Sequence, residues 1–324
     1  IRWSDPNDSV YDHTTLSTWE STILVRNNDH YPQSIKDGTI VVTNTNRNKY
    51  KDNAFSESIP NNTTYYYRFF TMSTNKVYND SNNMIFKIYN TTIDTTLKNN
   101  SWETISAISN LGVASSYWKI GDEISIPVNP YNTNCVLQIW DFDHFDKIDG
   151  SGKAGIVFGM KELLFGDVMK AEVTNYDKCV AWSMCEFRTN KLPGIEKCLP
   201  SDLIKYIIPV YTYTNNGPNG KEQSVIDKLF LPSITEMGDT TSSGENESKC
   251  KAFPIFNSNS SRVKRLNGIT QYYWTRTCSS YATPAYYLSD TYVCKSYCCI
   301  SDDGEFRTRE QNVSNTGFCL CFNV

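Results

Sequence analysis

Short runs of β-branched and aromatic residues dominate roughly the first 80 residues of the chain. Three of them stand out: Thr22-Ile23-Leu24-Val25, Thr39-Ile40-Val41-Val42-Thr43 and Tyr65-Tyr66-Tyr67-Arg68-Phe69-Phe70. Polar clusters such as Asn27-Asn28-Asp29 and Pro60-Asn61-Asn62 separate these runs, with no amphipathic helix between them. Strands of this length and spacing favour an antiparallel β-sandwich.

The same segment carries a resemblance to a known family. Its motifs, in order, are Trp3-Ser4-Asp5-Pro6, Trp19-Glu20-Ser21-Thr22, Leu24-Val25-Arg26, Tyr31-Pro32, Asp37-Gly38-Thr39, Arg47-Asn48-Lys49-Tyr50 and Asn62-Thr63-Thr64-Tyr65-Tyr66-Tyr67. Together they resemble the fibronectin type III-like modules of tail proteins from phages and prophages of Gram-positive bacteria. The resemblance covers roughly residues 1–84 and implies an Ig-like sandwich that acts as a spacer or carrier.

The length of 324 residues predicts a second domain after this one. A polar run at 79–83 marks the expected boundary, which gives a first domain at 1–84 and a second at 85–324. We expect residues 84–89 to form a strand that connects the two.

Two helices are expected in the second domain. Trp102, Ile105, Ile108 and Leu111 recur at helical spacing, and Ser101 is placed to cap the first turn. A second helix is expected over 199–207, with Ser201 or Asp202 as its cap. The remainder consists of short strands and long loops, which is an α+β pattern.

Four further motifs carry a second resemblance, which extends over about residues 97–324. They are Ser116-Tyr117-Trp118-Lys119-Ile120-Gly121-Asp122, Gln138-Ile139-Trp140-Asp141-Phe142-Asp143-His144, Asp227-Lys228-Leu229-Phe230-Leu231-Pro232-Ser233 and Tyr272-Tyr273-Trp274-Thr275-Arg276-Thr277. They resemble a family of domains of unknown function common in phage and gut-bacterial proteins. That resemblance implies a C-type lectin-like fold of the formylglycine-generating-enzyme type.

The chain departs from this family at its end. Members finish with a Gly-Val-Arg-Pro-Ala-like strand, whereas this chain has Gly317-Phe318-Cys319-Leu320-Cys321-Phe322-Asn323-Val324. One interpretation is targeted variation by a diversity-generating retroelement, which would make about 273–323 a variable segment. The alternative is drift at a tolerant surface, and the sequence leaves both open.

Composition favours binding over catalysis. Aromatic residues reach 13% while charged residues are only 20%, and Tyr, Ser and Asn are the residues of adaptable binding surfaces. With 31 Lys+Arg against 35 Asp+Glu and no long basic run, nucleic acid is not an expected partner. No apolar stretch is long enough to predict membrane insertion.

The expected recognition surface lies near the C-terminus, where seven tyrosines fall between residues 272 and 297, interleaved with Ser, Thr and Cys. Trp274 is expected to be buried framework. The predicted ligand-binding residues are Tyr273, Thr277, Ser280, Tyr281, Tyr286, Tyr287, Tyr292, Cys294, Tyr297, Phe318 and Leu320.

Catalytic and metal-binding interpretations find less support. The run Asp141, Asp143, His144, Asp146 and Asp149 lacks the spacing of a calcium loop and, if it is a strand, alternates between faces. Six of the eleven cysteines lie at or beyond residue 278, but without the paired spacing of a zinc site. We therefore expect no catalytic residue, metal or cofactor. An oxidase of the formylglycine-generating type, using Cys294 with Cys298 or Cys299, is the alternative of a different class.

These observations predict a non-enzymatic host-recognition protein of a phage tail, located in the virion and acting at the host cell surface. The expected partners are a bacterial surface protein or glycan and other tail proteins. A homo-oligomer is expected, with a trimer as one candidate. A purely structural virion component is the remaining alternative.

Overall fold

The computed structural model divides the chain into two compact units, Ile1–Thr92 and Ile93–Val324. It describes residues 1–61, 63–79, 84–129, 133–169, 181–215, 222–239, 247–279, 283–284, 292–293 and 296–324. The described chain is 37% strand and 15% helix, so the expectation of a β-rich protein with few helices is confirmed. Each unit has its own core and is described separately.

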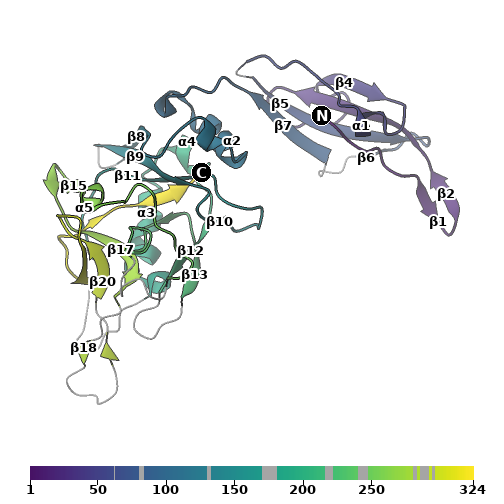
Figure 1. The fold of residues 1–324 in the computed structure, drawn as a ribbon. Helices are drawn as coiled ribbons and strands as arrows, with labels where there is room; N and C mark the ends of the chain where they lie inside the picture. Colours follow the sequence, from purple (N-terminus) through teal and green to yellow (C-terminus); the bar gives the residue numbers. More distant parts are fainter. Residues whose placement is uncertain are drawn as a thin grey trace. The chain divides into compact units, whose positions relative to one another are not determined.

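The first unit is built on one antiparallel sheet of five strands (Figure 1). The strands are β4 (Thr39–Asn44), β3 (Trp19–Asn27), β5 (Thr63–Ser73) and β6 (Tyr78–Asn79), in that order, with β7 (Ile85–Asn90) also paired to β5. A hairpin of β1 (Ser9–Tyr11) and β2 (Thr14–Ser17) and the one-turn helix α1 (Lys49–Asp52) complete it. The three runs predicted as strands are confirmed as β3, β4 and β5.

Buried side chains on β3 and β5 form the core of this unit. Ile23, Val25 and Phe70 pack together with Ile35, and the ring of Tyr67 stacks on Phe86 with 4.8 Å between centroids. Because β-branched and aromatic side chains pack well on a pleated surface, these residues account for both the strands and their pairing.

The boundary between the units lies later than the sequence predicted. The strand expected over 84–89 is present as β7, but it pairs along β5 from Thr63↔Asn90 to Arg68↔Ile85 and so belongs to the first unit instead of connecting two domains. The first unit therefore ends at Thr92 rather than at residue 84. From the sequence, an edge strand such as β7 could not be distinguished from a linker between domains, since both are short and extended.

Both predicted helices of the second unit are present, and one begins differently. Helix α2 (Trp102–Asn110) begins after Ser101, whose side chain accepts a hydrogen bond from the Thr104 amide at 3.2 Å. Helix α4 (Ser201–Ile204) is shorter than predicted, and Pro200, not Ser201 or Asp202, occupies its N-cap position. The other helical segments are η2 (Leu97–Asn99), η3 (Ala114–Ser116), η4 (Trp182–Met184), η5 (Phe187–Lys191), α3 (Leu192–Glu196) and α5 (Asn259–Arg262).

A five-stranded sheet forms the centre of the second unit. Its order is β14 (Leu229–Phe230), β23 (Cys321–Asn323), β11 (Ile156–Met160), β9 (Thr133–Phe142) and β8 (Glu123–Val128). The last strand of the chain thus lies inside the sheet, at the yellow end of the colour scale in Figure 1. Every residue of β11 is buried, as expected for a strand covered on both faces.

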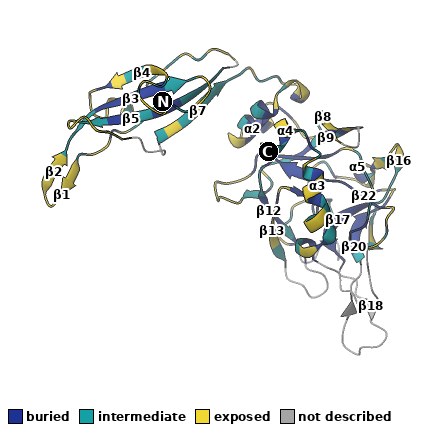
Figure 2. Ribbon diagram, turned by 180° about the vertical axis from the view of Figure 1, so that it is seen from behind, coloured by how far each residue is buried: buried dark blue, intermediate teal, exposed yellow. Residues whose placement is uncertain are grey.

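Smaller sheets pack around this centre. One is β10 (Asp146–Lys147), β12 (Val210–Thr214) and β13 (Gln223–Asp227), and another is the hairpin β15 (Arg265–Leu266) with β16 (Ile269–Thr270). The third has the order β21 (Phe306–Glu310), β20 (Ser296–Ile300), β17 (Tyr273–Cys278) and β22 (Gly317–Phe318). In the third sheet, β17, β20 and β22 are almost wholly buried (Figure 2), whereas β21 and the hairpin of β15 and β16 contain no buried residue.

Candidate recognition site

Strand β17 is the base of the predicted recognition surface. All six of its residues are buried, and it lies between β20, which is antiparallel to it, and β22, which is parallel. The Tyr273 hydroxyl donates to the Arg262 carbonyl at 2.6 Å, and Trp274 Nε1 donates to the Asp167 carbonyl at 3.0 Å. Trp274 is therefore framework, as predicted.

A buried ion pair fixes the middle of β17. Arg276 and Glu236 are both almost wholly buried, and each guanidinium NH group of Arg276 contacts one carboxylate oxygen of Glu236. The remaining donors of Arg276 reach the carbonyls of Tyr213, at 2.9 and 3.0 Å, and Leu231, at 2.7 Å. Because the ion pair is bidentate and the guanidinium makes further hydrogen bonds, these contacts fix the orientation of β17.

A second buried carboxyl group, Glu247, lies beside this pair. The Thr277 hydroxyl donates to Glu247 Oε1 at 2.6 Å and accepts from the Ile234 amide at 2.9 Å. Burial raises the pKa of Glu247, although Arg276 and the Thr277 hydroxyl act in the opposite direction. The neutral form of this group is therefore favoured by the fold.

This environment predicts a pH dependence of stability. A carboxyl group whose pKa is raised on folding stabilises the folded state most below its unfolded pKa, here 4.5, and this contribution is lost as pH rises through the folded value. Glu247→Gln, which stays neutral, should flatten the fall of melting temperature with rising pH above 4.5. Melting curves recorded across that range for both proteins would check this. If the melting temperature of the variant fell with pH as steeply as that of the unmodified protein, Glu247 would not be the group responsible.

Five of the predicted binding residues belong to the core, which corrects the expectation that they face solvent. They are Tyr273, Thr277, Tyr297, Phe318 and Leu320, each at most 2% exposed. The reason is that β17, β20 and the chain from β22 to β23 are covered on both faces. Phe318, for example, stacks on Phe187 with ring centroids 3.6 Å apart.

The other six predicted residues are Ser280, Tyr281, Tyr286, Tyr287, Tyr292 and Cys294. All but Tyr292 lie outside the described residues, and Tyr292 is described by its backbone alone, in β19 (Tyr292–Val293). They share one stretch, residues 280–295, which runs from the end of β17 to the start of β20 and which we call the recognition segment. All six therefore remain predictions.

One strand pair within the recognition segment is described. Strand β18 (Thr283–Pro284) pairs with β19 in antiparallel register, Thr283↔Val293 and Pro284↔Tyr292. Figure 1 shows β18 at the end of the second unit opposite α2, beyond the sheet that contains β17. The segment thus departs from, and returns to, two buried neighbouring strands.

The described cysteines around this base are poor candidates for thiolate chemistry. Burial raises the pKa of Cys298, and it raises that of Cys299 to about 12 and that of Cys319 to about 11. A nucleophilic or redox-active cysteine needs the opposite shift. The proposed partners of Cys294 in the oxidase alternative therefore remain protonated at neutral pH.

The acidic residues between 141 and 149 do not converge on one site, because three of them make separate local contacts. His144 Nδ1 lies 2.7 Å from Asp141 Oδ2, Asp146 pairs with Lys153 at 2.8 Å, and Asp149 accepts from the Ser151 amide at 2.9 Å. Within the part of the chain that the structure describes, no group of three or more His, Cys, Asp or Glu side chains could hold a metal ion. In the same part, no helix is long and apolar enough to cross a membrane.

A family model described as a domain of unknown function (DUF6273) matches residues 194–314. The matched range runs from within α3 to just beyond β21, so it contains β17, the recognition segment and both buried carboxyl groups. No curated protein and no solved structure matches the chain.

Sequence reasoning missed the two carboxyl partners of β17. Glu236 and Glu247 lie 40 and 29 positions before Arg276, in stretches with no motif of their own. The sequence feature that could have pointed to these carboxyl groups is Arg276 itself. An arginine inside a strand of otherwise uncharged residues needs a buried anion as its partner.

Proposed function

We propose that this chain is the host-recognition part of a phage or prophage tail, binding a bacterial surface protein or glycan through residues 280–295. In this proposal the second unit is a C-type lectin-like domain and the first is a fibronectin III-like sandwich that carries it. The motif order along the sequence is the basis for both finer assignments, and the β-rich character of the chain agrees with them.

The observation that carries the proposal is the contrast between the recognition segment and its base. The base consists of buried strands held by the Arg276–Glu236 pair, whereas the segment joining them contains four tyrosines, Tyr281, Tyr286, Tyr287 and Tyr292. Binding surfaces gain affinity when adaptable aromatic residues are presented by a scaffold that does not have to be ordered on binding.

Multiple copies would raise the strength of such binding. A tail carries several copies of its proteins, so a homo-oligomer, for example a trimer, would convert modest single-site affinity into strong attachment. The same assembly would bring the chain into contact with other tail proteins, and the first unit is the part we assign to that role.

Replacing Tyr281, Tyr287 and Tyr292 together by Ala should remove at least about nine-tenths of cell binding, since aromatic anchors dominate recognition surfaces. The melting temperature should stay nearly unchanged. The measurement is adsorption of the labelled full-length chain to a panel of Gram-positive and gut bacterial strains, paired with a melting curve.

Tyr297→Ala is the matched control, because Tyr297 is the same residue type but wholly buried in β20. It should lower the melting temperature clearly, as loss of a buried aromatic ring does. A triple variant that melts early would assign the three tyrosines to the core. A stable triple variant that adsorbs normally would favour a structural virion component.

A further inference from the structure

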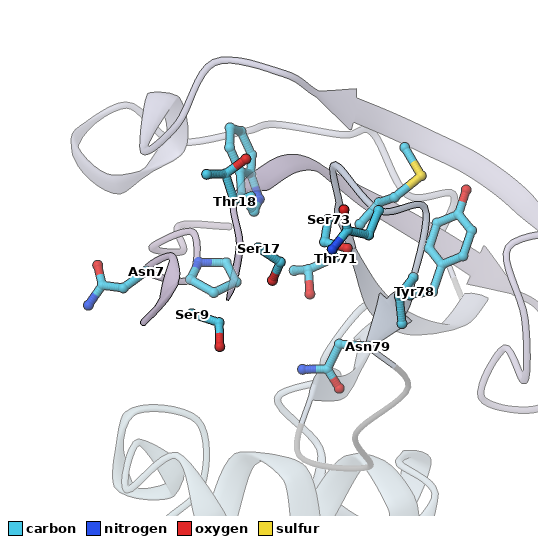
Figure 3. Close-up of a pocket in the computed structure, with 13 residues that line it drawn as sticks. Asn7, Ser9, Ser17, Thr18, Thr71, Ser73, Tyr78 and Asn79 are labelled. Atoms are coloured by element: carbon cyan, nitrogen blue, oxygen red, sulfur yellow. The ribbon is translucent and has the colours of Figure 1, made fainter. Parts of the chain in front are cut away.

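A pocket of about 350 Å³ opens on the first unit, where β3 begins and β5 ends (Figure 3). Its lining comes from the chain before β1, the ends of β1 and β2, and the β5–β6 turn. In the close-up, Ser17 and Thr71 lie in the middle, with Asn7 and Ser9 on one side and Tyr78 and Asn79 on the other. The volume is at the lower end of the range for small-ligand sites.

Strand register explains why these residues meet. The directly paired positions around the pocket are Ser9↔Ser17, Trp19↔Ser73, Thr71↔Asn79 and Met72↔Tyr78. Every one of these pairs lies within or next to a described strand of the first unit. Eight of the thirteen lining residues thus lie in strands of the sheet and its hairpin, and the other five lie in the segments that join or precede these strands.

The chemistry of the lining is uniformly neutral. Among the described residues that line the pocket, eight are Ser, Thr or Asn, the other five are Pro6, Trp19, Met72, Val77 and Tyr78, and none is charged. Asp8, Glu20 and Lys76, which flank lining positions in the sequence, are in ion pairs: Asp8 with Arg47, and Glu20 with Lys76 at 2.5 Å. The pocket thus offers hydroxyl and amide groups together with aromatic surface, but no formal charge.

Several of these polar groups are available to a ligand. The hydroxyls of Ser9, Ser17 and Ser73 make no hydrogen bond to the described residues. In contrast, the Thr18 hydroxyl is engaged with that of Thr74 at 3.0 Å, and Trp19 Nε1 donates to Thr22 at 3.0 Å. Tyr78 is 38% exposed, so its ring can accept a stacking partner.

We propose that this pocket binds an uncharged saccharide unit. Serine hydroxyls and asparagine amides can both donate to and accept from sugar hydroxyls, and the ring of Tyr78 can cover the apolar C–H face of a sugar. A phosphate or carboxylate would find no cation here, and a purely apolar ligand would leave the serine hydroxyls unpaired. The first unit would then bind a ligand itself in addition to carrying the second.

Titration of the full-length chain with neutral sugars tests this directly. The probes are glucose, galactose, mannose, N-acetylglucosamine, lactose and maltose, with glucuronate and N-acetylneuraminate as the acidic set. At least one neutral sugar should bind with a dissociation constant of about 1 mM, as a small neutral ligand in an open pocket would. Tyr78→Ala should weaken that binding about tenfold or more. Ser17→Arg, which fills the pocket from a second strand, should do the same.

Tyr117→Ala is the matched control, since Tyr117 is also 38% exposed but belongs to the second unit. It should leave sugar binding unchanged. In the triple variant at Tyr281, Tyr287 and Tyr292, which lacks the proposed recognition tyrosines, the sugar binding that remains should still be weakened by Tyr78→Ala. The inference is overturned if no neutral sugar binds, if the acidic sugars bind as well as the neutral ones, or if neither Tyr78→Ala nor Ser17→Arg weakens binding. Because the triple variant tests the recognition segment separately, the two proposals can fail independently.

Discussion

Replacing Arg276 by methionine should lower the free energy of unfolding of the second unit by about 3–5 kcal/mol. The substitution keeps the apolar stem but leaves the Glu236 carboxylate buried without its cation. It also removes the donors that reach the carbonyls of Tyr213 and Leu231. Urea unfolding of the full chain, read in the transition of the second unit, gives the value.

Arg265→Met is the matched control for this prediction. Arg265 lies 3.9 Å from Glu162, and both side chains are about half exposed, so the loss should be at most about 1 kcal/mol. Adding Glu236→Leu to Arg276→Met should recover part of the loss, because the unpaired buried charge is removed. Equal losses for Arg276→Met and Arg265→Met would show that the buried pair does not hold β17.

Gly159→Ala should destabilise the second unit by roughly 3 kcal/mol. A Cβ atom on Gly159 would lie 2.0 to 2.3 Å from ring atoms of Trp140. That ring cannot easily move, because Phe253 and Phe256 pack against it at centroid distances of 5.4 and 4.9 Å. The buried ammonium group of Lys264 lies 5.2 Å from its centroid. The same unfolding measurement applies.

Gly194→Ala provides a control of opposite sign. Gly194 lies in helix α3, where a Cβ atom would meet nothing within 4 Å. Alanine is favoured over glycine in helices, so this change should stabilise the unit by up to about 1 kcal/mol. If both substitutions shifted stability in the same direction and by similar amounts, the close contact between β11 and Trp140 would not be the cause.

The sequence predicted well those features that depend on local chemistry. The runs of β-branched and aromatic residues at 22–25, 39–43 and 65–70, with polar turn residues between them, identified three strands, because strand preference and turn formation act over a few residues. Ser101 identified the start of α2 for the same reason, since capping involves only the first turn. Trp274 was correctly assigned to the framework.

Local sequence chemistry could not decide which tyrosines belong to the core and which to the surface. Tyr273 and Tyr297 have the same composition around them as the tyrosines of the recognition segment, and a phenol ring suits a half-buried strand as well as a binding surface. Phe318 and Leu320 were placed on a variable surface because their end of the chain departs from the resembled family. In the structure that end enters the central sheet.

What the sequence by itself determined is therefore the β-rich class, the positions of the main strands and of α2, and the framework role of Trp274. Tertiary structure alone decided that β7 joins the first unit, that β17 is covered on both faces, and that Glu236 meets Arg276. The physical reason is distance along the chain. Strand pairing and buried ion pairs join residues tens of positions apart, and no local pattern specifies which partner closes each contact.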